Sequence, residues 1–310
     1  MTEVELIIVG GGPAGLTSAI YSARALIDTL VIEKMLPGGQ PVLTTFIENY
    51  PGFPEGISGP ELAERLESQA GKFGAKIITS RPVLNISRKE EGFEIKTEME
   101  SFLGKAVIVA TGTSPRKLNV PGEEEFTGRG VSYCAVCDGA FYRDRVVAVV
   151  GGGDSAMDES IYLTRFASKV FVIHRRNQLR AEKILQERAF SNPKISFIWD
   201  TVVQSIEGDR KVELLKLKNV KTGEISELKV DGIFVYIGST PNSSMVKDLV
   251  ELDENGFIIT DNCMKTSVPG LFAAGDVRNT NFRQLATAIG DGAIAANSAE
   301  RYLGELSWKA

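Results

Sequence analysis

Cysteine and histidine are scarce in this chain, which has three cysteines and one histidine among 310 residues. Three cysteines are too few for the disulfide framework of a small secreted domain. A structural zinc site needs four ligands, and beyond Cys134 and Cys137 the chain offers only Cys263 and His174, which do not form a second ligand pair. We therefore expect no metal site, and we interpret Cys263 as a lone thiol.

The chain also lacks long apolar runs and an excess of positive charge. No run approaches the roughly 20 apolar residues of a membrane-spanning helix, and the N-terminal residues lack the features of a secretion signal. The net charge is −5 and the isoelectric point is near 5.3, so no basic field attracts nucleic acid or an anionic membrane. We expect a cytoplasmic protein that binds neither nucleic acid nor membrane.

What the sequence does contain is a repeated unit. Two segments each predict a strand, a glycine-rich turn, a helix and a second strand. In the first copy these are 4–9, 10–15, a helix through Ala25, and 29–32; in the second they are 146–150, 151–156, a helix to about Phe166, and 169–173. Alternating segments at 93–97 and 212–218 predict short antiparallel strands inserted before the closing strands, 106–110 and 233–237. A chain of this length accommodates two domains.

The segment after Asn242 does not begin a third unit. Residues 256–259, 271–276 and a helix at about 291–302 are interpreted as the last strand and helix of the first unit. We therefore predict an α/β fold with two Rossmann-like, three-layer nucleotide-binding domains, the second inserted in the first. The first domain is expected at 1–115 and 245–310 and the second at 118–242, joined by two crossings whose Gly, Pro, Ser and Thr content suits a hinge.

The first glycine turn has the spacing of a dinucleotide-binding fingerprint. Gly10, Gly12 and Gly15 permit a tight turn, approach of the backbone to a pyrophosphate, and packing of helix on strand. Glu33 follows the next strand, where a carboxylate accepts hydrogen bonds from ribose hydroxyls. A glycine-rich turn alone is a weak signal, but its position between strand and helix, together with Glu33, predicts a dinucleotide site.

The second fingerprint, Gly151, Gly153 and Ala156, is followed by cations instead. His174-Arg175-Arg176 ends the next strand, and Arg180 lies about one helical turn beyond. Guanidinium groups at this position pair with a 2′-phosphate, which favours NADP over NAD. The alternative interpretation is a solvated basic start to an amphipathic helix.

Cys134 and Cys137 form a Cys-x-x-Cys motif just before the second fingerprint. This spacing allows a reversible disulfide and is typical of thiols with a lowered pKa, so a redox-active dithiol is favoured over an inert buried pair. Asp138 follows directly and is the nearest group to move a proton. Its alternative role is that of a turn or capping residue beside Gly139.

With these residues in view, the chain resembles the low-molecular-weight thioredoxin reductases over essentially its whole length. The motifs that carry the resemblance are the two fingerprints, Gly38-Gly39-Gln40, Glu48-Asn49-Tyr50-Pro51-Gly52, Ala110-Thr111-Gly112, Cys134-Ala135-Val136-Cys137-Asp138, His174-Arg175-Arg176 with Arg180, Ala274-Gly275-Asp276, and Arg283-Gln284. The resemblance implies that the first domain holds FAD and the inserted domain NADPH. The implied FAD contacts are Gly10, Gly12, Pro13, Ala14, Gly15, Glu33, Gly39, Gln40, Asn49, Thr111, Gly112, Gly275, Asp276, Arg283, Gln284 and Ala286. The implied NADPH contacts are Gly151, Gly153, Asp154, Ser155, Ala156, His174, Arg175, Arg176 and Arg180.

The resemblance also implies an order of events. NADPH reduces FAD, FAD reduces the Cys134–Cys137 disulfide, and the dithiol reduces thioredoxin by exchange, with rotation of the inserted domain between steps. Cys137 would face the flavin, Cys134 would attack thioredoxin, and Asp138 would be the acid and base. A homodimer is implied as well. The alternatives are a reductase of another thioredoxin- or glutaredoxin-like protein, an NADPH oxidase or diaphorase that does not need the dithiol, and a redox-sensing flavoprotein.

Overall fold

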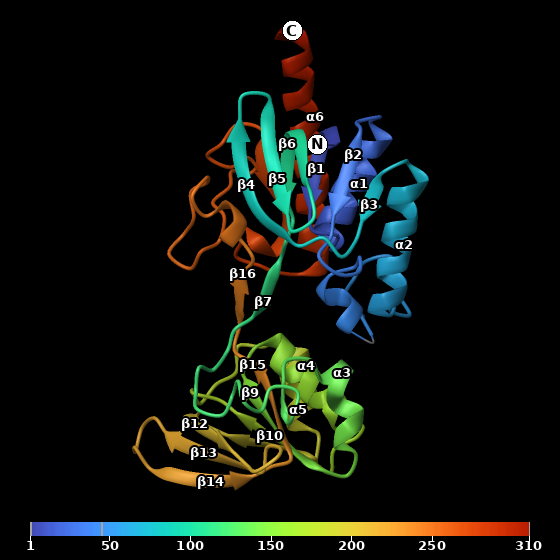
Figure 1. Cartoon of the computed structure of the whole chain (residues 1–310). Helices are drawn as coiled ribbons and strands as arrows, with labels where there is room; N and C mark the ends of the chain where they lie inside the picture. Colours follow the sequence, from blue (N-terminus) through green and yellow to red (C-terminus); the bar gives the residue numbers. More distant parts are fainter. Residues whose placement is uncertain (1, 45, 310) are drawn as a thin grey trace. The chain divides into compact units, whose positions relative to one another are not determined.

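The chain forms two compact units, of which the first comprises Met1–Ser114 and Thr240–Ala310 and the second Pro115–Ser239. A computed structural model describes residues 2–44 and 46–309, with side chains described as far as residue 306. The predicted α/β fold with parallel sheets is confirmed (Figure 1). Which nucleotide each unit binds stays a prediction.

The first unit is built around a mixed seven-stranded sheet covered by helices. Its elements are β1 (Thr2–Val9), α1 (Pro13–Arg24), β2 (Thr29–Ile32), η1 (Gln40–Leu43), α2 (Gly59–Lys72), β3 (Lys76–Ile78), β4 (Val83–Lys89), β5 (Gly92–Thr97), β6 (Ser101–Val109), η3 (Ser244–Val246), β17 (Leu271–Ala273), η4 (Gly275–Val277) and α6 (Leu285–Lys309). The strand order is β3-β2-β1-β6-β5-β4, with β17 also pairing with β6. The long β6 therefore pairs with antiparallel β5 along its first half and with parallel β17 along its second.

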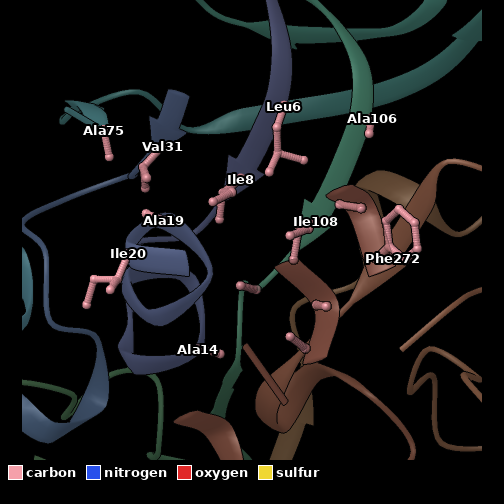
Figure 2. Packing of buried hydrophobic residues seen from close by; sticks show 14 of the residues in the cluster. Leu6, Ile8, Ala14, Ala19, Ile20, Val31, Ala75, Ala106, Ile108 and Phe272 are labelled. Carbon is pink, nitrogen blue, oxygen red and sulfur yellow. The ribbon is translucent and has the colours of Figure 1, made fainter. Parts of the chain in front are cut away.

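Period-two alternation in the central strands separates two apolar cores in this unit. Leu6, Ile8, Ala106 and Ile108 face one side, where they pack with residues of α1 and α6 (Figure 2). The intervening residues of β1 and β6 face a second core that includes Val246 and residues of β17. Because both faces of these strands are buried, their sequences are continuous runs of apolar residues.

The second unit has three layers. Its elements are β8 (Val131–Ser132), α3 (Ala135–Asp138), η2 (Gly139–Tyr142), β9 (Val146–Gly151), α4 (Asp154–Leu163), β10 (Lys169–Ile173), α5 (Lys183–Phe190), β11 (Ile195–Ile198), β12 (Thr201–Glu207), β13 (Leu214–Asn219), β14 (Ile225–Lys229) and β15 (Gly232–Tyr236). The parallel sheet β11-β10-β9-β15-β8 buries one face under α3, α4 and α5 and the other under the antiparallel sheet β12-β13-β14.

The two crossings between the units form a short ribbon. Strand β7 (Thr113–Pro115) pairs with β16 (Ser239–Pro241), and both are labelled in Figure 1. Two expected elements differ from the structure. The last helix begins at Leu285 rather than at about Asp291. Residues 256–259 make only isolated bridges, through Ile258, because a turn closed by Asp253 interrupts extended pairing there.

A substitution at Phe234 tests how much its side chain contributes to the core of the second unit. Phe234 is fully buried in β15 and meets the Tyr142 ring edge-on at a centroid distance of 5.3 Å. Phe234→Ala should therefore lower the free energy of unfolding by about 3–5 kcal/mol, because it removes a large apolar side chain and leaves a cavity. Urea unfolding followed by circular dichroism measures this change. Phe141→Ala, at a side chain that is 81% exposed in the same unit, should change it by less than about 0.5 kcal/mol, and equal losses would contradict the assignment of Phe234 to the core.

Candidate active site

The first glycine turn connects β1 to α1 and leaves no room for side chains at two positions. Gly10 has φ +105°, and a Cβ there would overlap the carbonyl oxygen of Ala110. A Cβ on Gly15 would overlap the carbonyl oxygen of Gly10. Gly12 faces more open space, since the Cα of Gly39 is 3.7 Å from where its Cβ would be. Strand and helix thus meet at backbone contact, and the first amides of α1 are left to face an anion.

Glu33 is buried at the end of β2, with 7% of its surface exposed. Its carboxylate accepts hydrogen bonds from the amide of Gly11 at 2.7 Å and from the amide of Met35 at 2.8 Å. It therefore fixes the glycine turn while placing a negative charge beside it. A carboxylate has four lone-pair sites, so two remain for the hydroxyls of a ribose. This donor and acceptor set fits the adenosine half of FAD.

Several other predicted contacts of the first unit gather around this turn. Gly39, at φ +63°, brings its backbone to Gly12, where an added Cβ would be 3.0 Å from the Gly12 Cα. A Cβ on Gly275 would be 2.9 Å from that of Ala14. Gln40 donates to the carbonyl of Thr113 at 2.7 Å. These contacts bring segments far apart in the sequence to the carboxyl ends of β1 and β6, where open α/β sheets bind ligands.

The remaining predicted contacts are placed by polar networks within the same unit. Asn49 donates to the side-chain carbonyl of Gln284 at 3.2 Å. The guanidinium of Arg283 lies over the Phe257 ring, 3.9 Å from its centroid. Burial raises the pKa of the Asp276 carboxyl, an effect that the charge of Arg283 opposes. The hydroxyl of Thr111 donates to the carbonyl of Asn242 at 2.6 Å, and the amide of Asn242 donates to the carbonyl of Gly112 at 3.0 Å. Ala286 lies in the first turn of α6.

Sequence reasoning missed one residue of this network, Asp291. Its carboxylate accepts from the amide of Gly275 at 3.1 Å and lies 3.5 Å from the guanidinium of Arg278, with both side chains largely buried. Burial raises the pKa of Asp291, whereas Arg278 and the Gly275 amide lower it. The available signal was an acidic residue in the first half of α6, where its neighbours in the sequence are small or apolar.

The second glycine turn is shaped by a side chain from the next strand. A Cβ on Gly152 would overlap the His174 ring, whereas among the described residues no atom lies within 4 Å of a Cβ placed on Gly153. A Cβ on Gly151 would be 2.7 Å from that of Ala156, so strand and helix are close here too. The backbone carbonyl of Gly152 also accepts from the amide of Arg180 at 2.6 Å, which ties Arg180 to the turn.

His174 is separated from the arginines that follow it. The ring is buried, with 6% exposure, and its Nε2 is 3.1 Å from the carbonyl of Gln178. Burial lowers the pKa of His174, and the charges of Arg180, Arg175 and Arg176 lower it further, against the raising effect of the Gln178 carbonyl. The imidazole therefore supports the turn as a neutral ring, and the positive charge belongs to the arginines.

The three arginines are exposed and line an open pocket of about 390 Å³ together with Asp200 and Lys221. Asp200 pairs with Lys221 at 2.8 Å, so the pocket keeps a positive excess. Asp154 and Ser155 begin α4, and Asp154 accepts from the amide of Glu182 at 2.7 Å. A planar guanidinium is the side chain best suited to a phosphate, so this pocket fits the 2′-phosphate of NADPH.

Cys134 and Cys137 form a disulfide at the start of α3, with their Cα atoms 5.4 Å apart. Cys134 is half-buried and Cys137 is exposed. The Ser132 hydroxyl accepts from the amide of Cys134 at 3.1 Å, and the Asp138 amide donates to the Cys134 carbonyl at 3.2 Å. Gly139 lets this short helix lie close to α4, because a Cβ there would be 3.3 Å from Leu163. Backbone hydrogen bonds and the packing of α3 on α4 thus hold the disulfide turn in the second unit.

Tyr236 was not predicted as a site residue, although it contacts the disulfide turn. Its hydroxyl accepts from the amide of Ala135 at 2.8 Å. Burial raises the pKa of Tyr236, and the charges of Glu159 and Asp138 add to that effect. The sequence signal was a tyrosine within the apolar run 233–237.

Cys263 is a free, exposed thiol in the first unit. Among the described residues, no group of three or more His, Cys, Asp or Glu side chains could hold a metal ion. Within the same residues, no helix is both long and apolar enough to cross a membrane.

Two glycine turns of nucleotide-binding type and a disulfide in one chain define a nucleotide-dependent disulfide oxidoreductase. Comparison with known proteins agrees. A model of the family described as Pyridine nucleotide-disulphide oxidoreductase matches residues 4–292. The chain is 49% identical over 306 residues to the thioredoxin reductase of Listeria innocua, covering 97% of this chain and 94% of the relative.

Solved structures give the same result. The thioredoxin reductase of Lactococcus lactis, in its FR conformation, is 49% identical and superposes with a TM-score of 0.95, covering 97% of this chain and 99% of the other. The thioredoxin reductase of Streptococcus pyogenes MGAS5005 is 51% identical and gives a TM-score of 0.65, covering 98% and 99%. The chain therefore belongs to the pyridine nucleotide-disulphide oxidoreductase family, among the low-molecular-weight thioredoxin reductases.

The adjacent glycines 152 and 153 provide a matched pair of substitutions. Gly152→Ala should lower the free energy of unfolding by about 1–3 kcal/mol, because its Cβ displaces the His174 ring. Gly153→Ala should change stability by less than about 0.5 kcal/mol, yet weaken NADPH binding if the pyrophosphate approaches this backbone. Urea unfolding and calorimetric titration with NADPH separate the two effects. Equal stability of both variants would contradict the described position of His174.

Proposed function

We propose that this protein is an FAD- and NADPH-dependent thioredoxin-disulfide reductase. The observation that carries the proposal is the Cys134–Cys137 disulfide on α3, in the same unit as the arginine-lined pocket. The first unit would hold FAD through the glycine turn, Glu33 and the contacts around Gly39 and Gly275. When bound, the flavin supplies two-electron chemistry that connects hydride transfer from NADPH to reduction of a disulfide.

The second unit contributes the recognition of NADPH. Arg175, Arg176 and Arg180 would hold the 2′-phosphate, and Gly153 would admit the pyrophosphate to the start of α4. His174 would not contact the coenzyme; its ring packs against Gly152 and supports the turn. These separate roles explain why a neutral histidine and three charged arginines lie in one short segment.

The dithiol performs the exchange with the protein substrate. After reduction, the Cys134 thiolate attacks the disulfide of thioredoxin and forms a mixed disulfide, which the Cys137 sulfur then resolves to release dithiol thioredoxin. Asp138 is the nearest carboxyl to supply and accept the proton that accompanies opening and closing of the Cys134–Cys137 bond. The exchange leaves the chain in its disulfide form, ready for another two electrons.

Rotation of one unit relative to the other completes the proposal. A disulfide that must meet a flavin in one step and a protein in the next needs two arrangements. The β7–β16 ribbon, made of Thr113–Pro115 and Ser239–Pro241, contains both chain crossings and is the place for such a hinge. Two relatives of nearly equal identity, 49% and 51%, match this chain with TM-scores of 0.95 and 0.65. Units that keep their folds but change their relative orientation produce such a difference.

The partner is thioredoxin or a thioredoxin- or glutaredoxin-like protein. A homodimer follows from the resemblance to the family. A dithiol that works by being reduced with NADPH suits a reducing compartment, which supports a cytoplasmic location.

The role of the dithiol is tested by a double substitution. In Cys134→Ser Cys137→Ser, NADPH should still bleach the flavin absorbance, but thioredoxin reduction should fall by at least about a thousandfold because the exchanging sulfurs are gone. Anaerobic stopped-flow absorbance with and without thioredoxin measures both steps. Cys263→Ser, at the exposed cysteine of the first unit, is the control and should retain both. NADPH oxidation that is equal in the wild type and the double variant, and independent of thioredoxin, would support an NADPH oxidase instead.

The arginines are tested by coenzyme preference. Arg175→Ser Arg176→Ser should reduce the ratio of kcat/KM for NADPH to that for NADH about tenfold to hundredfold, because charge-assisted bonds to the 2′-phosphate are lost. Steady-state kinetics with each coenzyme gives the ratio. Arg210→Ser, at an exposed arginine elsewhere in the unit, should leave it unchanged. An equal decrease of kcat/KM with NADPH and with NADH would show that the arginines do not bind the 2′-phosphate.

A further inference from the structure

Helix α4, which packs against the helix of the disulfide turn, carries a carboxyl group that the proposed reaction does not use. Glu159 lies on α4, and its Oε2 is shielded from solvent without a hydrogen-bond partner among the described residues. A buried polar atom left in this condition costs free energy and calls for an explanation. A glutamate with this energetic cost, on the helix that supports the disulfide turn, points to a role in the chemistry of that turn.

The helix that carries Glu159 packs against the disulfide turn and against β15. On β15, the hydroxyl of Tyr236 accepts a hydrogen bond from the Ala135 amide of that turn at 2.8 Å. Ala135 lies between the two cysteines and is fully buried. The charge of Glu159 acts on Tyr236, as does the charge of Asp138. Tyr236 is therefore the residue that is affected both by the Glu159 carboxyl and by the disulfide turn.

The protonation of Glu159 changes in the neutral range. Burial raises the pKa of Glu159 to about 7, and the adjacent Asp158 contributes in the same direction. The carboxyl is neutral below that pH and carries a negative charge above it. Since α3, α5, β9, β10 and β15 pack against α4, the other charged or titratable side chains on these elements are also relevant. They are Asp138, Lys169, Lys183, Glu187, Arg188 and Tyr236.

We propose that Glu159 is a positioning residue of the dithiol: its partly buried carboxyl, acting through the Tyr236 hydroxyl, determines how easily the reduced Cys134–Cys137 pair holds a thiolate. Reduction of the disulfide by two electrons and one proton gives one thiol and one thiolate. A neutral Glu159 leaves that negative charge unopposed, whereas an ionised Glu159 adds a like charge on the supporting helix and disfavours the thiolate. This inference rests on the proposed function, because it concerns the dithiol that the reaction uses.

The pH profile of thiol reactivity tests the proposal. The purified holoprotein is reduced with a phosphine, and the alkylation rates of Cys134 and Cys137 by iodoacetamide are followed by mass spectrometry from pH 5.5 to 9. Exposed Cys263 serves as the internal reference in the same sample. In the wild type we expect a profile with a step near pH 7 in addition to the ionisation of the thiol. The reference thiol should show a single ionisation.

Glu159→Gln keeps the shape of the side chain but removes its charge. The step should disappear, and the apparent pKa of the more reactive thiol should fall by about 0.5–1 unit, which raises the alkylation rate at pH 7.5 about threefold to tenfold. Tyr236→Phe should reduce the step, because it removes the hydroxyl through which Glu159 acts. Glu224→Gln, at an exposed glutamate between β13 and β14, should retain the wild-type profile. An unchanged step in Glu159→Gln, or a full-sized step in Tyr236→Phe, would overturn the proposal.

A further variant decides the matter if Glu159→Gln does not fold. Asp158→Asn removes the neighbouring charge that raises the pKa of Glu159, so the step should move to lower pH. A step that stays in place would refute the assignment to Glu159. The measurement needs neither thioredoxin nor NADPH. A protein that shows the predicted profile but does not reduce thioredoxin would contradict the proposed function while supporting this inference.

Discussion

The structure depends on the close approach of backbone to backbone at the carboxyl ends of two parallel strands. In the first unit, any side chain at position 15 would overlap the Gly10 carbonyl, and in the second the Ala156 side chain already fills the space above Gly151. Because strand and helix touch at these points, the helix amides open directly onto the edge of each sheet. The same constraint therefore sets the packing of the core and the position of both nucleotide sites.

The disulfide depends on a different kind of support. Helix α3 is a single short turn, and such a turn is not stable by itself. It is held by packing on α4 at Gly139 and by one hydrogen bond from the Ala135 amide to Tyr236. The reactive pair therefore derives its geometry from the helix layer of the second unit. Substitutions in that layer should therefore change the reactivity of the two cysteines even where the substituted residue does not contact them.

Sequence reasoning identified features that are local in the chain and missed those that depend on distant contacts. The strand 169–173 has the predicted bounds, and the disulfide joins the two predicted cysteines. The start of α6 was placed six residues too late, since its first turns contain glycine and polar residues that interrupt the apolar period. Asp291 and Tyr236 act on backbone amides 16 and 101 residues away, a separation that no local pattern encodes. The burial of His174 was likewise invisible, because it depends on the absence of a side chain at Gly152.

Under the proposed function, the two units distinguish their nucleotides by the charge that follows the equivalent strand. After the equivalent strand, the first unit places a buried carboxylate and the second a group of exposed guanidinium groups. A carboxylate at this position accepts from ribose hydroxyls and repels a phosphate, whereas a guanidinium donates hydrogen bonds to a phosphate and attracts its negative charge. If His174 were charged as well, its cation would lie buried beside the charges of Arg175, Arg176 and Arg180, a costly arrangement. Its lowered pKa removes that cost. The neutral ring can then support the turn while the exposed arginines remain free to bind an anion.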